Sequence, residues 1–347
     1  MVRKSKIGVI LLSLIIFSFI LGGCKQDKPT LYVYNWGDYI DESILKEFEK
    51  EAGIKVIYDT FATNEDMYVK IKSGGSSYDV IFPSDYMLTR MIEEEMLEKI
   101  DLDKIPNYKY LDNRFMGNDY DPNNEYSLPY MWGTMGILYN TTMVNEVVDS
   151  WDILWDPKYT KEILMLDSQR DSIGAALLKL GYSLNTLDSR ELAEAGELLK
   201  KQKPLVLAYV VDEGKDKMVA GEAALALTWS GEAAYACEEN ADLAYAIPKE
   251  STNIWFDVMA IPKGAKNKEG ALKFMDFLNL PEISLRNAEY TGYATPNSAA
   301  KAMLPEEVRN DPSLYPEEED LVNAEVFVNL GKTLKEYDRI WTEVKAH

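Results

Sequence analysis

Between residues 30 and 85, stretches in which apolar and polar positions alternate are followed by stretches with apolar residues at helical spacing. Alternation is typical of half-buried strands, and repeats of three and four residues are typical of amphipathic helices. Strands are therefore expected at residues 31–35, 54–58 and 78–83, and helices at 42–52 and 67–71. The order strand, helix, strand, helix, strand predicts an α/β fold with a parallel sheet and helical crossovers.

The same kind of patterning continues along the rest of the chain. Further strands are expected at 127–129, 136–140, 163–166, 205–211, 224–229 and 243–247, and further helices at 173–180, 192–201 and 216–220. A strand at 258–261 and a helix at 269–278 then resume the pattern of the first part, after a second sheet is complete. We therefore expect two lobes built from discontinuous segments, residues 29–137 with 257–300 and residues 138–256 with 301–347.

The first 24 residues have the arrangement of a secretory signal. A basic start is followed by an apolar stretch at residues 7–21 and by two glycines before Cys24. A retained membrane helix is the alternative, but about 15 residues are few for a span that needs roughly 20. The small pair and the cysteine resemble the lipobox of bacterial lipoproteins. We expect residues 1–23 to be a signal peptide, Cys24 the lipidated mature N-terminus and residues 24–30 a polar tether.

The chain is strongly acidic, with a formal net charge of -21 at pH 7. Residues 1–23 carry three positive charges and no negative charge, so their removal changes the total from -21 to -24. An acidic surface repels nucleic acid, whose phosphates are bound by Lys and Arg, and it attracts cations. The composition disfavours a nucleic-acid partner and is compatible with a cationic ligand, although acidity can also serve only solubility.

Cysteine and histidine are too scarce for several kinds of site. The two cysteines are Cys24 and Cys237, so lipidation of Cys24 leaves no pair for an internal disulfide. The one histidine, His347, is the last residue, which disfavours histidine metal sites and His-based triads. We expect no metal, no cofactor and no catalytic residue.

Aromatic residues and carboxylates share the loops that follow the predicted strands. In open α/β sheets, ligands bind at the carboxyl ends of the strands. Ring faces attract ammonium groups by about 0.5 to 2 kcal/mol each, and carboxylates accept charge-assisted hydrogen bonds from them. The combination favours a site for an organic cation, and its candidate residues are Trp36, Asp38, Tyr39, Ser84, Asp85, Tyr86, Asp167, Ser168, Asp171, Trp229, Trp255, Asp257 and Tyr293.

Individual residues of this set also have simpler interpretations. Trp229 and Trp255 could be ordinary core aromatics. Asp38 and Asp85 could be helix N-caps, as is common for Asp between a strand and a helix. The coincidence of all these residues at loop positions is what favours a binding site.

Several motifs resemble those of one family. They are residues 31–39 (LYVYNWGDY), 83–86 (PSDY), 121–124 with 129–133, 255–257 (WFD) and 292–297 (GYATPN). In this order, from residue 30 to the C-terminus, the chain resembles the spermidine/putrescine-binding lipoproteins of bacterial ABC importers. The resemblance implies a type II periplasmic-binding-protein fold, in which two α/β lobes joined by hinge crossovers close on the ligand.

The resemblance also implies roles for single residues. Asp257 would be the main acid that holds an ammonium group, and Ser84 would line the same cleft. Asp171 stands where the family has a glutamate that serves a terminal amine, and Asp85 is included in the predicted set through its loop position. An aromatic box would consist of Trp36, Tyr39, Tyr86, Trp229, Trp255 and Tyr293.

Two positions depart from the family pattern. Ser168 stands where some members have an aspartate, and Phe327 where some have a glutamine that helps to hold the far amine. One end of the pocket would then lack two polar contacts. We therefore expect the third amine of spermidine to add little to its affinity. Putrescine should bind with an affinity close to or higher than that of spermidine.

The expected function is capture of putrescine, spermidine or both by a lipid-anchored monomer on the extracytoplasmic face of the membrane, and delivery to ABC permease subunits. Two alternatives stay open. One is a protein of the same fold that binds another organic cation. The other is a carbohydrate-active hydrolase in which paired acids such as Asp167 and Asp171 act on sugars held by the aromatics. Such an enzyme would need an acid with a raised pKa.

Overall fold

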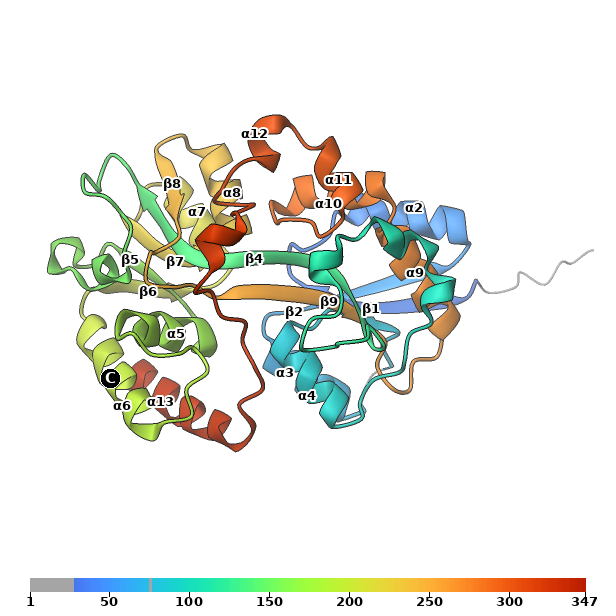
Figure 1. Cartoon of the computed structure of the whole chain (residues 1–347), viewed down its shortest axis with the longest axis horizontal. Helices are drawn as coiled ribbons and strands as arrows, with labels where there is room; N and C mark the ends of the chain where they lie inside the picture. The colour runs from blue at the N-terminus through green and yellow to red at the C-terminus, as the bar shows by residue number, and fades with distance from the viewer. Residues whose placement is uncertain (1–27, 75–76) are drawn as a thin grey trace, which may run out of the picture.

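The computed structural model describes residues 28–74 and 77–347 of the chain (Figure 1). The predicted signal peptide at residues 1–23, the predicted lipidation site Cys24 and most of the predicted tether lie outside the described residues. Within the described part, no helix is both long enough and apolar enough to cross a membrane.

The strands of the described residues form one mixed sheet in the order β2-β1-β3-β9-β4-β7-β5-β6, with β8 (Leu243–Ala246) paired to β4. In the first half, β1 (Thr30–Trp36) lies parallel to β2 (Lys55–Phe61) and β3 (Val80–Ile81). In the second half, β5 (Ile163–Leu166) lies parallel to β6 (Val206–Val210) and β7 (Leu225–Trp229). The predicted α/β class and the parallel crossovers within each half are confirmed.

Two long strands connect the halves. β4 (Ser127–Asn140) pairs antiparallel with β9 (Ile254–Ala260) along its first part and with β7 and β8 along its second part. Figure 1 shows β4 and β9 side by side across the centre of the molecule. The prediction of two separate strands at 127–129 and 136–140 is wrong, because residues 131–134 pair with β9 instead of forming a loop.

Helices cover both faces of each half (Figure 1). In the first half, α2 (Glu42–Ala52), α9 (Lys268–Leu278) and α10 (Pro281–Thr291) lie on one face, and α3 (Asn64–Lys72) and α4 (Asp85–Glu93) on the other. In the second half, α7 (Glu213–Val219) and α8 (Ser230–Glu239) lie on one face, and α5 (Gln169–Lys179), α6 (Ser189–Gln202) and α13 (Leu334–Ala346) on the other.

Shorter helices complete the chain. In the upper part of the view in Figure 1 lie α11 (Ser298–Met303) and, at the top, α12 (Glu306–Arg309). Single 3-10 turns occur at Leu102–Lys104, Pro106–Tyr110, Asn113–Phe115, Trp151–Trp155, Pro157–Tyr159, Glu318–Leu321 and Gly331–Thr333.

The start of α2 decides between two interpretations of Asp38. Asp41 is the N-cap, and its side chain accepts a hydrogen bond from the backbone N–H of Ser43 at 2.8 Å. The helix ends at Gly53, whose φ of 67° is left-handed and suits glycine. The interpretation of Asp38 as a helix cap is therefore wrong. Asp85 is likewise not an N-cap, because it is the first residue of α4 and follows the cap residue Ser84.

Separate apolar cores fill the two halves. In the second half, α13 packs with α5 and α6 around Tyr337, which is fully buried. In the first half, Leu304, Leu314 and Tyr315 pack in the same core as Phe256 of β9. The chain just after residue 300 thus packs against the first half and α13 against the second, while the exact lobe boundaries stay a prediction.

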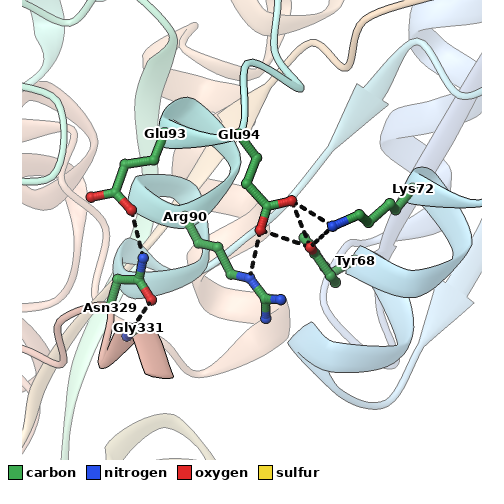
Figure 2. Close-up of polar contacts among 7 residues, drawn as sticks. All are labelled: Tyr68, Lys72, Arg90, Glu93, Glu94, Asn329 and Gly331. Carbon is green, nitrogen blue, oxygen red and sulfur yellow. Dashed lines mark hydrogen bonds and ion pairs between the residues drawn. The ribbon is translucent and has the colours of Figure 1, made fainter. Parts of the chain in front are cut away.

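Polar side chains also connect the halves at the surface (Figure 2). Glu93, at the end of α4, accepts a hydrogen bond from the side-chain amide of Asn329 at 2.7 Å. Beside it, Glu94 accepts from the ammonium of Lys72 at 2.7 Å and from the hydroxyl of Tyr68. The hydrogen bond from Lys72 lowers the pKa of Glu94 to about 2. The first contact joins the halves, and the second stays within the first half.

Candidate functional site

A cavity of about 340 Å³ lies between the two halves of the molecule. Its lining comes largely from residues that follow β1, β2, β3, β5 and β6, from the last residue of β7, from the first part of β9, and from α13. Open α/β sheets bind ligands at this edge. All ten predicted ligand-binding residues line it, namely Trp36, Tyr39, Ser84, Asp85, Tyr86, Asp171, Trp229, Trp255, Asp257 and Tyr293. Asp38, Asp167, Ser168 and Phe327 line it as well.

Asp257 on β9 is the acceptor of two hydrogen bonds inside this cavity. It is 6% exposed, its Oδ1 accepts from the hydroxyl of Ser84 at 2.6 Å, and its Oδ2 accepts from the hydroxyl of Tyr39 at 2.7 Å. Burial raises the pKa of Asp257 to about 6, although both hydrogen bonds act in the opposite direction. No Lys or Arg in the described part of the chain forms an ion pair with it.

A second buried carboxylate, from the other half, repeats this arrangement. Asp171 lies in the first turn of α5 and is 6% exposed. It accepts a hydrogen bond from the indole N–H of Trp229 at 3.2 Å and another from the hydroxyl of Ser168. Burial raises the pKa of Asp171. Each half therefore supplies one desolvated carboxylate that neutral donors hold, and among the described residues neither carboxylate has an ion-pair partner.

The cavity as a whole is strongly acidic. Its lining contains nine carboxyl side chains and one guanidinium, that of Arg170. Buried like charges are unfavourable unless a counter-ion is present. The described residues contain no group of three Asp, Glu, Cys or His side chains arranged to hold a metal ion. The excess of carboxyl groups in the lining therefore suits a cation.

Three aromatic residues form a continuous wall of this cavity. The ring of Tyr293 meets Tyr39 edge-on at a centroid distance of 5.3 Å and meets Trp255 edge-on at 5.2 Å. These contacts fix the orientation of the rings. The indole N–H of Trp255 is buried and has no hydrogen-bond partner among the described residues. Trp36 differs, because its indole N–H donates to the backbone oxygen of Phe82 at 2.8 Å.

Two glycines allow this wall to form. A Cβ at Gly231 would lie 2.2 Å from the ring of Tyr293, and a Cβ at Gly133 would lie 2.6 Å from the ring of Trp255. No side chain fits at such distances. Gly133 belongs to β4 and Gly231 to α8, so the connecting strand β4 and a helix of the second half approach the wall closely.

Arg170 is a lining residue that the sequence analysis missed. It is 3% exposed, and burial lowers its pKa. Its guanidinium carbon lies 4.3 Å from the ring centroid of Phe327 and 5.4 Å from that of Tyr86. It donates to the side-chain oxygen of Asn185 at 3.0 Å. A fixed cation thus stands beside Phe327, one of the two positions that depart from the family pattern.

Four acids of the lining were also missed, namely Glu65, Asp212, Glu232 and Asp338. Glu65 accepts a hydrogen bond from the hydroxyl of Tyr86 at 3.1 Å, and burial raises its pKa. Burial likewise raises the pKa of Glu232, to about 7, and that of Asp212. Asp212 follows β6, so its position after a strand could have identified it. Glu65 and Glu232 lie inside helices, where the sequence gives no such signal.

Asp85 differs from the other acids because the backbone already engages both of its oxygens. It is fully buried, its Oδ2 accepts from the N–H of Phe256 at 3.0 Å, and its Oδ1 accepts from the N–H of Tyr86 at 2.6 Å. Burial raises the pKa of Asp85 to about 8. This geometry attaches α4 to β9, and a direct contact of Asp85 with a ligand stays a prediction.

Lys215 bridges the two halves at the edge of the cavity. Its Nζ lies 3.1 Å from Oε2 of Glu232 and 3.6 Å from Oδ2 of Asp38. Asp38 follows β1 in the first half, whereas α7 and α8 of the second half carry Lys215 and Glu232. The side chains of Lys215 and Glu232 are only 13% and 12% exposed. The ammonium of Lys215 thus occupies the position of a counter-ion between two carboxylates.

Comparison with known proteins identifies the class. The family of bacterial extracellular solute-binding proteins matches residues 43–316. The spermidine/putrescine-binding periplasmic protein of Salmonella typhimurium is 41% identical over 323 residues, which cover 92% of this chain and 93% of that protein. The putrescine-binding periplasmic protein SpuD of Pseudomonas aeruginosa is 37% identical, with coverage of 98% and 99%. A solved structure from Listeria monocytogenes is 48% identical, covers 91% of this chain and 98% of its own, and has a TM-score of 0.89.

The chain therefore belongs to the bacterial extracellular solute-binding proteins. Within that family it is similar to polyamine-binding members of ABC transport systems. The two-lobe periplasmic-binding-protein fold that the motifs imply is confirmed by the structural match.

Proposed function

We propose that this protein binds putrescine, spermidine or both in the cavity between its halves and delivers them to the permease subunits of an ABC importer. The observation that carries the proposal is the pair of buried carboxylates, Asp257 and Asp171, each held only by neutral donors. A diamine brings two ammonium groups, and its methylenes match the aromatic lining. The identity of 41% to a spermidine/putrescine-binding protein supports this ligand class.

In this proposal, each terminal ammonium of the ligand is the counter-ion of one buried carboxylate. Asp257 holds one ammonium while Ser84 and Tyr39 orient its carboxylate, and Asp171 holds the other. A charge-assisted hydrogen bond in a site without water is roughly twice as strong as a neutral one. Asp85 acts as a positioning residue for β9. The apolar contacts come from Trp36, Tyr39, Tyr86, Trp229, Trp255 and Tyr293.

Catalysis is not part of the proposal, since the relatives are solute-binding proteins. The raised pKa of Asp85 meets one requirement of a hydrolase. However, Asp85 is fully buried and its two oxygens accept backbone hydrogen bonds, so it does not present a proton to a substrate.

We also propose that the protein is a monomer anchored to the outer face of the membrane by lipid on Cys24. Membership of an extracellular family supports the extracytoplasmic location. In cells supplied with radioactive palmitate, the wild-type protein should carry label and sediment with membranes. Cys24→Ala should lose the label and its membrane attachment. A labelled Cys24→Ala variant would disprove lipidation at this residue.

Calorimetric titration of the chain without residues 1–24 tests the ligand class. We expect saturable one-to-one binding of putrescine or spermidine and no binding of choline or maltotriose at the same concentrations. Binding of choline alone would favour a site for quaternary ammonium compounds. Binding of maltotriose alone would favour the carbohydrate alternative.

A further inference from the structure

A second cavity, of about 330 Å³, lies apart from the acidic one. It is bounded by α11, α12, the 3-10 turn Asn113–Phe115 and the strand β4. The linings of the two cavities share no residue. A volume of this size is within the range of pockets that hold small organic molecules, roughly 300 to 1,000 Å³.

The charge of this second cavity is opposite to that of the whole chain. Among the residues whose side chains the structure describes, three cations line it, Arg114, Lys301 and Arg309, against one acid, Asp112. Arg114 is paired with Asp112 at 2.8 Å. In the described part of the chain, Lys301 and Arg309 form no ion pair. In a chain of net charge -21, two cations without carboxylate partners in one pocket are unexpected.

The surroundings of Lys301 disfavour its charged form. Burial and the neighbouring Arg114 lower the pKa of Lys301, and Glu317 and Asp112 only partly oppose them. Glu317 and Glu318 also act on Arg114 from outside the lining. The Nζ of Lys301 lies 4.1 Å from the ring centroid of Tyr315, which is an aromatic contact and not a counter-ion.

An unpartnered buried donor is the second, independent feature of this cavity. Trp132 lines it and is 6% exposed, and its indole N–H has no hydrogen-bond partner among the described residues. The indole is a donor only, so it needs an acceptor. The ring of Trp132 lies 5.1 Å from that of Phe115 and 6.1 Å from that of Tyr315. Aromatic faces and donors therefore occur together in one pocket.

From these observations we infer that the second cavity is a binding site for a small organic anion, a carboxylate on a flat apolar body. Lys301 and Arg309 supply the charge, and Trp132, Phe115 and Tyr315 supply the apolar surface. The second cavity lies on the opposite face of the connecting strands from the acidic cavity. Trp132 pairs with Phe256, and the neighbours of Phe256, Trp255 and Asp257, line the acidic cavity. Successive side chains of a strand point to opposite faces of the sheet. The inference does not depend on the proposed polyamine function.

The test uses 4-fluorobenzoate as the probe and neutral 4-fluorobenzamide, of nearly the same shape, as the matched ligand control. Fluorine NMR titrations are done at constant ionic strength, adjusted with sodium chloride. We expect saturable binding of the benzoate, at least tenfold weaker binding of the benzamide, and no displacement of the benzoate by saturating putrescine. Equal binding of both probes, absence of saturable binding, or displacement by putrescine would overturn the inference.

Paired variants locate the site. Lys301→Gln with Arg309→Gln should weaken benzoate binding at least tenfold, and the charge reversal Lys301→Glu should do so alone. Lys46→Gln with Lys332→Gln removes the same charge from residues outside both cavities and should leave benzoate binding unchanged. Thermal melting curves, measured on the same samples, should match that of the wild type and show that all variants are folded. An equal loss of benzoate binding in the two double variants would assign it to net charge and overturn the site.

Discussion

The hydroxyl of Tyr39 donates a 2.7 Å hydrogen bond to Oδ2 of Asp257, although 218 positions separate the two residues in the chain. Tyr39 follows β1 and Asp257 lies in β9, so the order of the sheet brings them together. A neutral donor orients the carboxylate without neutralising it. Asp257 is thereby prepared for a cation that the described part of the protein does not supply.

Removal of this carboxylate should impair binding more than stability. Truncation of one partner of a buried charge pair costs about 2 to 5 kcal/mol. Asp257→Ala should therefore weaken putrescine binding by well over tenfold in calorimetric titrations. Asp103→Ala, at an exposed position outside the lining, is the matched control. A variant of Asp257 that melts like the wild type and binds putrescine with the same affinity would disprove the assignment.

Binding should also depend on pH. The pKa of Asp257 is raised from 3.8 to about 6, so the ligand-free folded chain holds a proton that the unfolded chain releases at lower pH. The stability of the ligand-free protein should therefore fall as pH rises from about 4 to about 6. An ammonium ligand favours the ionised form, so binding below pH 6 must release this proton.

Affinity for putrescine should accordingly fall about tenfold between pH 7 and pH 5. Asp171, whose pKa is also raised, acts in the same direction. Calorimetry in buffers of different ionisation enthalpy measures the proton release directly. Affinity that is constant over this range, with no proton release, would contradict a raised pKa of Asp257 in the ligand-free state.

Ligand length is the next prediction. Ser168 and Phe327 offer fewer contacts to a third ammonium than Asp and Gln would, and the guanidinium of Arg170 stands beside Phe327. An unpartnered buried ammonium is unfavourable. Putrescine should therefore bind with an affinity close to or higher than that of spermidine. Spermidine that binds a hundredfold more tightly would show that another group, such as Asp38 or Asp167, supplies the contact.

A pair of substitutions tests the cause of this preference. Ser168→Asp with Phe327→Gln should shift the affinity ratio toward spermidine by about tenfold, which corresponds to roughly one charge-assisted hydrogen bond. Ser189→Asp with Val328→Gln changes the same kinds of residue outside the lining and should leave the ratio unchanged. An unaltered ratio in the first variant would exclude both positions as selectivity determinants.

The Lys215 bridge should contribute to stability. Glu232 is largely buried, so Lys215→Met leaves a carboxylate without its counter-ion and should destabilise the protein by about 3 to 5 kcal/mol. Neutralising the acid as well, with Glu232→Gln, should restore part of this loss. Urea denaturation of the two single variants and the double variant measures the coupling. Lys273→Met, which removes an exposed ion pair with Glu269, should change stability by less than about 1 kcal/mol.

The sequence alone predicted much of the fold and of the candidate site. The helix α2 occupies the expected residues because its apolar spacing, Asp41 and Gly53 are local signals. The site residues after β1, β3 and β5 could be found because strand ends in an α/β sheet meet at one edge. Trp255, Asp257 and Tyr293, which belong both to this predicted set and to the family motifs, line the cavity as well.

Other features depended on partners distant in the chain, and only the tertiary structure decided them. β4 is continuous because β9, more than 100 residues later, supplies hydrogen bonds to residues 131–134. In the sequence, Arg170 and Lys215 look like ordinary cations on a helix surface. In the structure, Arg170 packs against the ring of Phe327, and Lys215 forms an ion pair with Glu232. Asp85 follows a strand, which is where a ligand-binding residue is expected, but its carboxylate accepts a hydrogen bond from the backbone N–H of Phe256. Periodicity identifies which residues face inward, whereas hydrogen-bond and charge partners are fixed only when distant segments pack together.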